Sequence, residues 1–440
     1  MQILIGLHTF PHRFTYLLIP LPPEQRCGHV GQARLPRHAG VVECGGAQSR
    51  TASGKHHLEA EATPALREQR FRIIGKARAA AAQPVKLMHI LHVVGARPNF
   101  MKLAPVWRAL QTYACFRQTL VHTGQHYDPG MSEIFFQQLG IPVADVNLSV
   151  GSGSHAQQTA DVMAGLEPVV LERKPDLVLV YGDVNSTLAA ALVCSKLNIR
   201  LGHVEAGLRS GDRAMPEEIN RLVTDQLSDL LFTPSEDADA NLQREGVAPE
   251  KIYRVGNVMI DSLVQLLPAA RECCVNGFPD QYVLVTLHRP SNVDDGAALK
   301  EILSSLLAIA NELPVVFPAH PRTQQRITAF GLHTGGLHLL PPLPYVEFLA
   351  LQSRAVAVIT DSGGIQEETT YLGVPCLTVR NNTERPVTVS IGTNVLVGQD
   401  LDKLSGELAN ILKGCGKKGR IPPLWDGRTG ERIAELLQKM

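Results

Sequence analysis

The sequence of 440 residues has no uninterrupted apolar run of about 18 residues, the length that a membrane-spanning helix requires. Its opening segment is apolar only in patches and is interrupted by Pro11, His12 and Arg13. It therefore lacks the basic start and the clean apolar block of a signal peptide. We expect a cytoplasmic protein that does not act in a membrane.

A charge surplus is also missing, because 42 Lys and Arg residues balance 42 Asp and Glu residues. A protein that coats nucleic acid needs a basic surplus to neutralise phosphates, so the composition argues against this class of function. The eight cysteines form no C-x-x-C pair and no zinc-type cluster. We expect reduced thiols in a cytosolic chain and no metal site.

Asp is absent from residues 1–87, which contain twelve Lys and Arg residues against five Glu, a local charge of +7. No helical or strand period persists in this segment, and its composition is too poor to build a packed core. We interpret it as a disordered extension translated from an upstream start, with the globular protein beginning at Met88. A basic targeting or regulatory arm is the alternative.

From Met88 onward, short apolar segments alternate with segments of helix length, a pattern typical of parallel sheets buried on both faces. We predict an α/β fold with one sheet in residues 88–256, a second in 257–422 and a C-terminal helix in 423–440 that packs back on the first domain or, alternatively, on the second. Ligands of such sheets bind where the strands end, and a cleft between two domains is a favoured site. The predicted strands are 89–94, 119–123, 177–182, 200–205, 230–235, 282–288, 315–320 and 355–360.

Polar residues follow several of these strands. Arg97 and Lys102 follow the first strand, where they suit a phosphate or carboxylate ligand, although a surface pair is the alternative. The preceding GARP segment matches neither G-x-G-x-x-G nor a Walker A loop. The segment therefore lacks the simplest sequence evidence for a site that binds a nicotinamide dinucleotide or ATP. Asp183 follows another strand, either as a helix N-cap or as a carboxylate base in the cleft.

Glu205 ends a buried strand, where an unpaired carboxylate would be costly to desolvate. We therefore expect it to pair with Arg209 or Arg213, or to line the cleft. The segment MPEEINR has Pro before two Glu, which is typical of a helix start. Glu217 and Arg221 are spaced to meet on one face of that helix, and an ordinary capped helix is the alternative.

Three histidines also end predicted strands, namely His203, His288 and His320. Strand alternation places His203 on the same face as Glu205. The spacing of the three does not suit a local metal site. Because all three are expected on one cleft, we do not expect all of them to be structural hydrogen-bonders.

The most informative segment is TDSGGIQEE at 360–368. A buried strand leads through Ser362 and two glycines into a helix, whose free N–H groups and dipole bind phosphate. Glu368 follows about one turn into the helix, near the place where the ribose of a nucleotide would lie. Arg385, in the NNTERP segment, is expected to reach the same anion. The pattern predicts a nucleotide-diphosphate site without a P-loop lysine.

These motifs, in this order, resemble the non-hydrolysing UDP-N-acetylglucosamine 2-epimerases: GARPNFMKLAP, TGQHYD, YGDVNST, HVEAGLRS, MPEEINR, VGNVMID, TLHRPSN, TDSGGIQEE and NNTERP. The resemblance covers about 350 residues, and residues 1–87 match nothing. It implies two Rossmann-like domains in the glycosyltransferase-B arrangement, the second binding UDP, in a cytoplasmic homodimer. It also implies reversible conversion of UDP-GlcNAc to UDP-ManNAc through 2-acetamidoglucal, for surface polysaccharide, with no redox cofactor or obligatory metal.

The resemblance further implies individual roles. The groups around the reacting sugar would be the carboxylates of Asp183, Glu205 and Glu217, with His288 assisting diphosphate departure and Lys102 and Arg221 completing the electrostatics. The UDP-binding residues would be Arg97, Ser362, Gly363, Gly364, Glu368 and Arg385, with Phe348 and also Tyr345 flanking the uracil. An allosteric second UDP-GlcNAc would bind at Gln125, His126 and His320.

The sequence departs from the family after His288, where Pro290 and Ser291 replace the commoner Arg-Glu, so the choice of sugar stays open. One alternative is an epimerase for a modified UDP-sugar, such as a 2,3-diacetamido uronic acid. Others are a hydrolysing epimerase, a retaining glycosyltransferase that requires an acceptor, and a nucleotide-sugar sensor without turnover.

Overall fold

The computed structural model describes residues 87–125, 138–273 and 277–440. The expectations for the N-terminal extension up to residue 86 and for His126 lie outside the described residues. The described residues belong to one compact unit, which contains every element below. No helix in the described ranges is both long and apolar enough to cross a bilayer.

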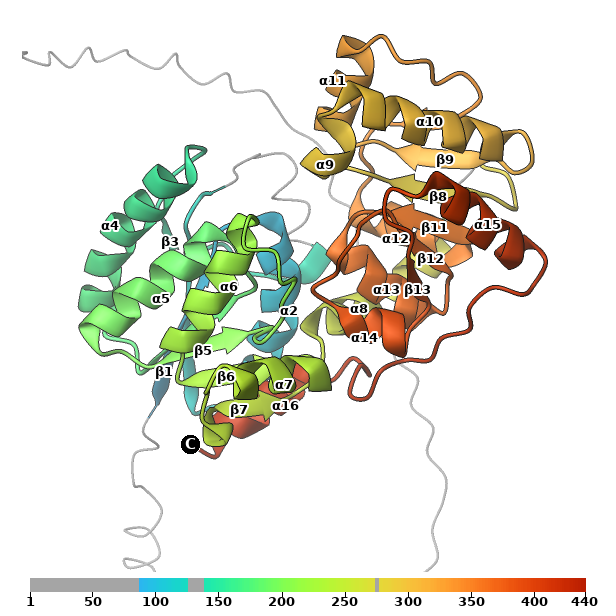
Figure 1. Cartoon of the computed structure of the whole chain (residues 1–440). Coiled ribbons are helices and arrows are strands. Elements are labelled where there is room, and N and C mark those ends of the chain that lie inside the picture. The colour runs from blue at the N-terminus through green and yellow to red at the C-terminus, as the bar shows by residue number, and fades with distance from the viewer. Residues whose placement is uncertain (1–86, 126–137, 274–276) are drawn as a thin grey trace, which may run out of the picture. The chain divides into compact units, whose positions relative to one another are not determined.

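The first sheet has seven parallel strands in the order β3-β2-β1-β4-β5-β6-β7 (Figure 1). Its strands are β1 (Met88–Val94), β2 (Phe116–His122), β3 (Val146–Asn147), β4 (Leu177–Tyr181), β5 (Leu201–Val204), β6 (Leu230–Thr233) and β7 (Ile252–Arg254). Its helices are α2 (Arg97–Gln111), α4 (His155–Arg173), α5 (Asn185–Leu197), α6 (Pro216–Leu227) and α7 (Glu236–Arg244), with the 3₁₀ turn η1 (Pro249–Lys251) before β7.

Both faces of this sheet are buried, which explains why its strands are continuously apolar. On β1, Ile90 packs into the core cluster that contains the apolar face of α2. The next residue, Leu91, packs into a different cluster with Leu166 of α4 and Ala190 of α5. Successive side chains of a strand point to opposite faces, so helices cover the sheet on both sides.

The second sheet has six parallel strands in the order β10-β9-β8-β11-β12-β13. Its strands are β8 (Val283–Thr286), β9 (Val315–Pro318), β10 (His338–Leu340), β11 (Ala357–Thr360), β12 (Cys376–Thr378) and β13 (Asn394–Leu396). Its helices are α8 (Val258–Glu272), α9 (Pro290–Val293), α10 (Gly296–Ala310), α11 (Pro321–Ala329), α12 (Tyr345–Arg354), α13 (Gly363–Leu372), α14 (Pro386–Ser390) and α15 (Leu401–Leu412).

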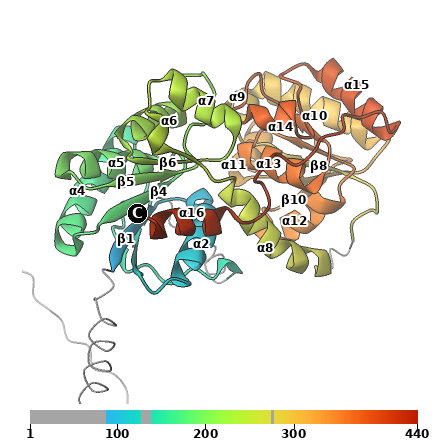
Figure 2. The same cartoon turned by 90° about the horizontal axis from the view of Figure 1, so that it is seen from below.

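Two helices join the parts of the chain that carry the sheets. Helix α8 contacts α2 as well as α12 and α13, and its Ser262 hydroxyl donates a hydrogen bond to the carbonyl of Met101. The C-terminal helix α16 (Thr429–Gln438) lies beside α2 (Figure 2), where Asp261 of α8 accepts the backbone N–H of Gly430 at 2.7 Å. Because contacts gather all these segments in one unit, the predicted domain bounds stay a prediction.

Each sheet reverses its strand order at one point, between β1 and β4 in the first and between β8 and β11 in the second. Such a switch point opens a crevice at the carboxyl ends of the strands, where ligands of these folds bind. The residues that follow the first pair of strands include Gly182 and Asp183, and those that follow the second pair include His288 and Ser362.

Candidate active site

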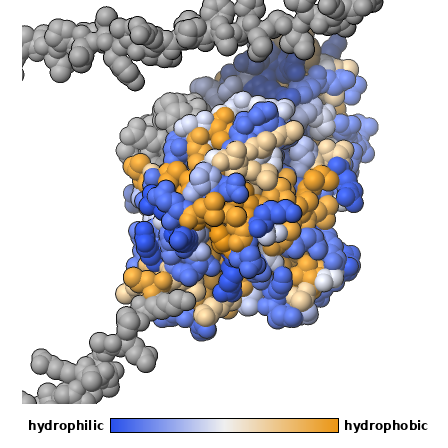
Figure 3. Space-filling model, turned by 90° about the vertical axis from the view of Figure 1, so that its left-hand side faces the viewer, coloured by the Kyte–Doolittle hydropathy of each residue, from blue (hydrophilic) through white to orange (hydrophobic). Residues whose placement is uncertain are grey.

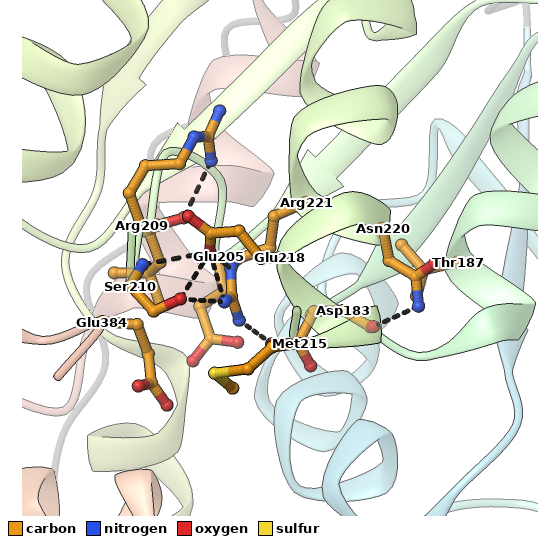
Figure 4. Close-up of polar contacts among 12 residues, drawn as sticks. Asp183, Thr187, Glu205, Arg209, Ser210, Met215, Glu218, Asn220, Arg221 and Glu384 are labelled. Atoms are coloured by element: carbon orange, nitrogen blue, oxygen red, sulfur yellow. Dashed lines mark hydrogen bonds and ion pairs between the residues drawn. The ribbon is translucent and has the colours of Figure 1, made fainter. Parts of the chain in front are cut away.

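Asp183 follows β4 at the switch point of the first sheet. Val184, not Asp183, occupies the N-cap position of α5, so the reading of Asp183 as a helix cap is wrong. Its carboxylate instead forms an ion pair with Arg221 (Figure 4). Burial would raise the pKa of Asp183, but the charges of Arg221 and Lys102 outweigh it and lower this pKa below its ordinary value. The carboxylate is therefore ionised at neutral pH.

Glu205 lies one residue beyond β5 with a φ of 75°, a left-handed conformation that costs a non-glycine residue free energy. Its carboxylate pairs with Lys102 and, at 3.2 Å, with Nη2 of Arg385. Its side chain is 3% exposed, so these two cations compensate the desolvation of the charge. Strained backbone of this kind is typical of functional sites.

The expectation that Glu205 pairs with Arg209 or Arg213 is wrong. Arg209 donates instead to Asp225 at 2.7 Å and to Glu245 at 2.6 Å. The left-handed turn at Glu205 directs its carboxylate away from these loop arginines and toward cations that are distant in the sequence.

Helix α6 supplies the next carboxylates. Arg221 donates to Glu218, with Nε at 3.0 Å from Oε2, so the predicted pairing of Arg221 with Glu217 is wrong. Glu218 also accepts the backbone N–H of Ser210 (Figure 4) and that of Gly211. A spacing of three residues satisfies the helical period as well as four does. Glu217 is exposed and available to a ligand.

His288 follows β8 at the switch point of the second sheet. The backbone N–H groups of His288 and Arg289 donate to the fully buried carboxylate of Asp361, and Nδ1 of His288 lies 3.0 Å from it. Burial would raise the pKa of Asp361, but the hydrogen bond and charge of His288 outweigh it and lower this pKa. Asp361 thus orients the imidazole and leaves Nε2 to face a ligand.

A cavity of about 460 Å³ opens beside His288, within the usual size range of ligand sites. It brings together many of the predicted substrate residues, and its lining includes Met259, His288, His320, Tyr345, Phe348, Ser362, Gly364 and Glu368. The Tyr345 hydroxyl donates to Glu368 at 2.9 Å. Burial raises the pKa of Glu368 to about 7, and this hydrogen bond opposes the rise.

The two glycines of the TDSGG segment have different surroundings. A Cβ at Gly364 would find only Met259 Cε, at 3.9 Å, so this residue leaves open space next to the cavity. A Cβ at Gly363 would meet Glu384 at 2.7 Å and Cζ of Arg385 at 2.9 Å. The absence of a side chain at Gly363 therefore leaves room for the buried Arg385–Glu384 ion pair to pack against the start of α13.

Arg385 is held by three carboxylates: Glu205 at 3.2 Å, Glu367 at 2.8 Å and Glu384 at 2.6 Å. Burial raises the pKa of Glu367, and the charge of Arg385 opposes the rise. Sequence reasoning missed Glu367 and Glu384, although each is adjacent to a residue that it did single out. An acidic residue directly beside a motif residue, Glu368 in one case and Arg385 in the other, is the signal that would have found them.

A second cavity, of about 990 Å³, shares His288 with the first. Its lining includes Glu217 and Asp212 together with cationic side chains that the sequence analysis had not connected: Arg289, Arg322 and Arg380. Pro290 and Ser291, the residues that depart from the family pattern, also line it. His288 therefore stands between the cavity with the glycine segment and the cavity with Glu217.

The remaining predicted residues lie elsewhere. Arg97 begins α2. Gln125 is buried and accepts a hydrogen bond from the Ser186 hydroxyl at 2.8 Å, and it does not line the cavity that contains His320. His203 is fully buried, so the expectation that it faces a cleft is wrong. Within the described ranges, no three His, Cys, Asp or Glu side chains converge as metal ligands would.

Two parallel α/β sheets that follow one another in the chain, each with its own switch point, are the arrangement of the glycosyltransferase-B class of α/β proteins. A family model described as UDP-N-acetylglucosamine 2-epimerase matches residues 108–438. The UDP-N-acetylglucosamine 2-epimerase of Methanocaldococcus jannaschii is 43% identical over 364 residues, which cover 80% of this chain and 99% of that protein. The chain belongs to the UDP-N-acetylglucosamine 2-epimerase family.

Two further similarities bear on fold and substrate. The crystal structure of the Methanocaldococcus jannaschii UDP-GlcNAc 2-epimerase in complex with UDP-GlcNAc and UDP aligns with a TM-score of 0.75 and 42% identity, covering 80% of this chain and 100% of that chain. The UDP-2,3-diacetamido-2,3-dideoxy-D-glucuronate 2-epimerase of Pseudomonas aeruginosa is 43% identical over 357 residues, which cover 80% of this chain and 100% of that protein. The predicted fold class is confirmed, and both relatives are epimerases.

Proposed function

We propose that this chain is a non-hydrolysing epimerase that interconverts UDP-GlcNAc and UDP-ManNAc by elimination and re-addition of UDP. The observation that carries the proposal is the pairing of two sites. Carboxylates paired with cations gather at the first switch point, and a cavity with Ser362, Gly364 and Glu368 lies at the second. Arg385 connects the two sets by contacting Glu205.

The chemistry explains why carboxylates and an imidazole are needed together. The C2 proton of the sugar is not acidic until the C1–O bond to UDP weakens and positive charge develops on the ring. A carboxylate then takes the C2 proton while the C1–O bond breaks, which gives 2-acetamidoglucal and UDP. UDP adds back to C1 while a proton arrives at C2 on the other face. Asp183, Glu205 and Glu217 are the proposed proton carriers.

The UDP would be held at the start of α13. Gly363 and Gly364 offer backbone N–H groups at the positive end of the helix dipole, and Ser362 at the N-cap adds a hydroxyl that makes no cap hydrogen bond. Glu368 would receive the ribose, and Phe348 with Tyr345 would flank the uracil, in the cavity that these side chains line. Arg97 and Arg385 would complete the anion site.

His288 would stabilise the departing diphosphate. Its Nδ1 faces Asp361, so Nε2 is the nitrogen that can donate a proton or hydrogen bond to a phosphate oxygen. Lys102 and Arg221 would hold the carboxylates of Glu205 and Asp183 in place through their ion pairs until the C2 proton is transferred. The proposal needs no redox cofactor and no metal.

The deciding experiment is NMR of the product mixture formed from UDP-GlcNAc alone in heavy water. Joined UDP-ManNAc with deuterium at C2 is the expected product. Recovered sugar nucleotides without deuterium at C2 would contradict the elimination. Free ManNAc with UDP would identify a hydrolysing enzyme, a requirement for an acceptor would identify a glycosyltransferase, and binding without turnover would identify a sensor.

A second candidate substrate is a UDP-2,3-diacetamido uronic acid, since the Pseudomonas aeruginosa enzyme is as similar as the Methanocaldococcus jannaschii one. Burial and the nearby charge of Arg380 lower the pKa of Arg289, which indicates crowded cations on the second cavity. A sugar carboxylate would relieve this repulsion. A higher kcat/KM for the uronate than for UDP-GlcNAc would identify it as the substrate.

We also propose the finer properties that the family resemblance implies: a cytoplasmic homodimer that supplies sugars for surface polysaccharide and has an allosteric site at Gln125, His126 and His320. Figure 3 faces the side that carries α4 and α5 and shows apolar residues gathered between charged ones. Helix α4 contributes Leu171, which is 53% exposed. Exposed apolar patches are typical of protein interfaces, which supports a dimer. Light scattering of the purified protein tests it.

A further inference from the structure

His203 on β5 is fully buried, yet both nitrogens of its ring meet hydrogen-bond acceptors. Nδ1 lies 2.6 Å from Oδ1 of Asp225, and Nε2 lies 2.8 Å from the carbonyl oxygen of Gly182. A carbonyl oxygen can only accept, so Nε2 carries a proton. Asp225 also acts as an acceptor, because its other carboxylate oxygen accepts from the backbone N–H of Gly207 and from the guanidinium of Arg209, as expected of a carboxylate. Nδ1 therefore carries a proton as well.

The carbonyl that His203 holds is next to a reactive carboxylate. Gly182 precedes Asp183 and has a φ of 63°, and its backbone N–H donates to the carbonyl of Val204 at 3.0 Å. A Cβ at Gly182 would collide with Nζ of Lys102 and would lie 3.2 Å from Oε2 of Glu205. The peptide that His203 fixes is thus packed directly against the Lys102–Glu205 ion pair.

Asp225 fixes the second reactive segment. Its Oδ2 accepts the backbone N–H of Gly207 at 3.1 Å and Nη1 of Arg209 at 2.7 Å. Glu205 has a φ of 75°, a conformation that costs a non-glycine residue free energy, so the turn that presents its carboxylate needs support from its surroundings. One buried pair of side chains therefore supports the backbone beside Asp183 and the backbone beside Glu205.

We infer that His203 and Asp225 are a positioning pair for the epimerisation, in which the doubly protonated ring of His203 sets the place of Asp183 and Asp225 sets the turn of Glu205. The inference rests on the proposed function. His203 has no exposed surface, so it acts through Gly182 and does not touch the sugar. A displacement of about 1 Å in a reacting group can lower a rate on the order of 10²-fold.

The test compares His203→Gln with His89→Gln. His89 is a matched control because it is also buried and its ring also makes hydrogen bonds, with Thr119 and with the Arg173 carbonyl. It lies near the amino end of β1, whereas the candidate site lies at the carboxyl ends of the strands. For His203→Gln we expect kcat to fall on the order of 10²-fold with unchanged KM and UDP affinity. For His89→Gln we expect kcat near the wild-type value, even where thermal stability falls.

Three outcomes would overturn the inference: wild-type kcat in folded His203→Gln, an equal loss of kcat in His89→Gln, or a loss of UDP affinity that parallels the loss of kcat. If His203→Gln does not fold, Asp225→Asn takes its place. For this variant we again expect a lower kcat with an unchanged KM. Wild-type kcat in folded Asp225→Asn contradicts the pair.

Nitrogen-15 NMR of the histidine rings provides a readout that does not depend on activity. At neutral pH we expect both nitrogens of His203 to have the shifts of protonated nitrogen. His92 is the reference in the same sheet, because burial lowers its pKa to about 3 and keeps its ring neutral. A neutral ring at His203 contradicts the inference. A wild-type enzyme that turns over no UDP-sugar would instead contradict the proposed function, whatever the NMR result.

Discussion

Arg385 Nη2 lies 3.2 Å from Glu205 Oε1, although 180 residues separate the two in the chain. Glu205 follows the first sheet, and Arg385 precedes α14 beside the second. This ion pair connects the carboxylate cluster of one switch point to the acidic pair Glu367 and Glu384 behind the helix start of the other. The proposed proton carrier and the proposed UDP site therefore share one buried cation.

Arg385→Met is expected to lower both stability and turnover. It leaves three buried carboxylates without their common partner, and breaking a buried pair typically costs about 3 to 5 kcal/mol. Denaturant unfolding measures the loss, and kcat with UDP-GlcNAc measures the effect on Glu205. Arg428→Gln is the control, since the Arg428–Glu431 pair is exposed and should change neither quantity. An Arg385→Met variant as stable as the wild type would contradict the structural role.

Glu368→Gln is expected to change how stability depends on pH. Burial raises the pKa of Glu368 from 4.5 to about 7, so the folded protein binds a proton that the unfolded chain releases. Stability from this group is present below about pH 4.5 and is lost as the pH rises toward about 7. The variant should therefore lose less stability than the wild type as the pH rises over this range. Part of the decrease in unfolding free energy should remain, because burial also raises the pKa of Glu367.

Unfolding free energies at several pH values across this window check the prediction. Glu347→Gln, an exposed position on α12, is the matched control and should keep the wild-type slope. A slope in Glu368→Gln that equals that of the wild type would show that Glu368 does not titrate in the window.

Most of the fold was predictable because it depends on local patterns. Every predicted strand segment overlaps a strand of the structure. The edge strands β3, β7, β10 and β13 have only two or three residues, too few for a recognisable alternation. Helix starts and the glycine segment after β11 were likewise readable from neighbouring residues.

The partners of charged groups were not predictable in the same way. The cations beside Glu205 are Lys102 and Arg385, which no local spacing connects to it. His203 was expected on the cleft because strand alternation was continued through Glu205. The chain leaves the extended conformation at Glu205, so the alternation of side chains ends at Val204. His203 therefore remains buried within β5 and does not share a face with Glu205. Long-range ion pairs and single left-handed residues leave no periodic signal in a sequence.

Asp183→Asn is expected to remove turnover while leaving UDP binding intact. Asn keeps the size of the side chain and can still accept a hydrogen bond from Arg221, which Glu218 also holds. It cannot take a proton from C2, so kcat should fall on the order of 10²- to 10⁴-fold. UDP titration calorimetry and thermal unfolding are the controls. Near-normal turnover in the folded variant would remove Asp183 from the proposed proton carriers.

The adjacent residues Glu217 and Glu218 allow a sharper comparison, because they differ in burial and not in chemistry. Glu218 is 2% exposed and holds Arg221 together with the backbone of Ser210 and Gly211. Glu218→Gln should therefore be destabilising, with a loss of about 3 kcal/mol or more, since it leaves the buried Arg221 charge less compensated. Denaturant unfolding measures this loss.

Glu217→Gln should have the opposite profile. Glu217 is exposed on the cavity that contains His288, so its stability should stay within about 0.5 kcal/mol of the wild type. If Glu217 carries a proton to or from C2, kcat should fall on the order of 10²-fold or more. Deuterium incorporation at C2 that continues without formation of the epimer would assign Glu217 to one face of the sugar. A fully active Glu217→Gln would leave Asp183 and Glu205 as the remaining carriers.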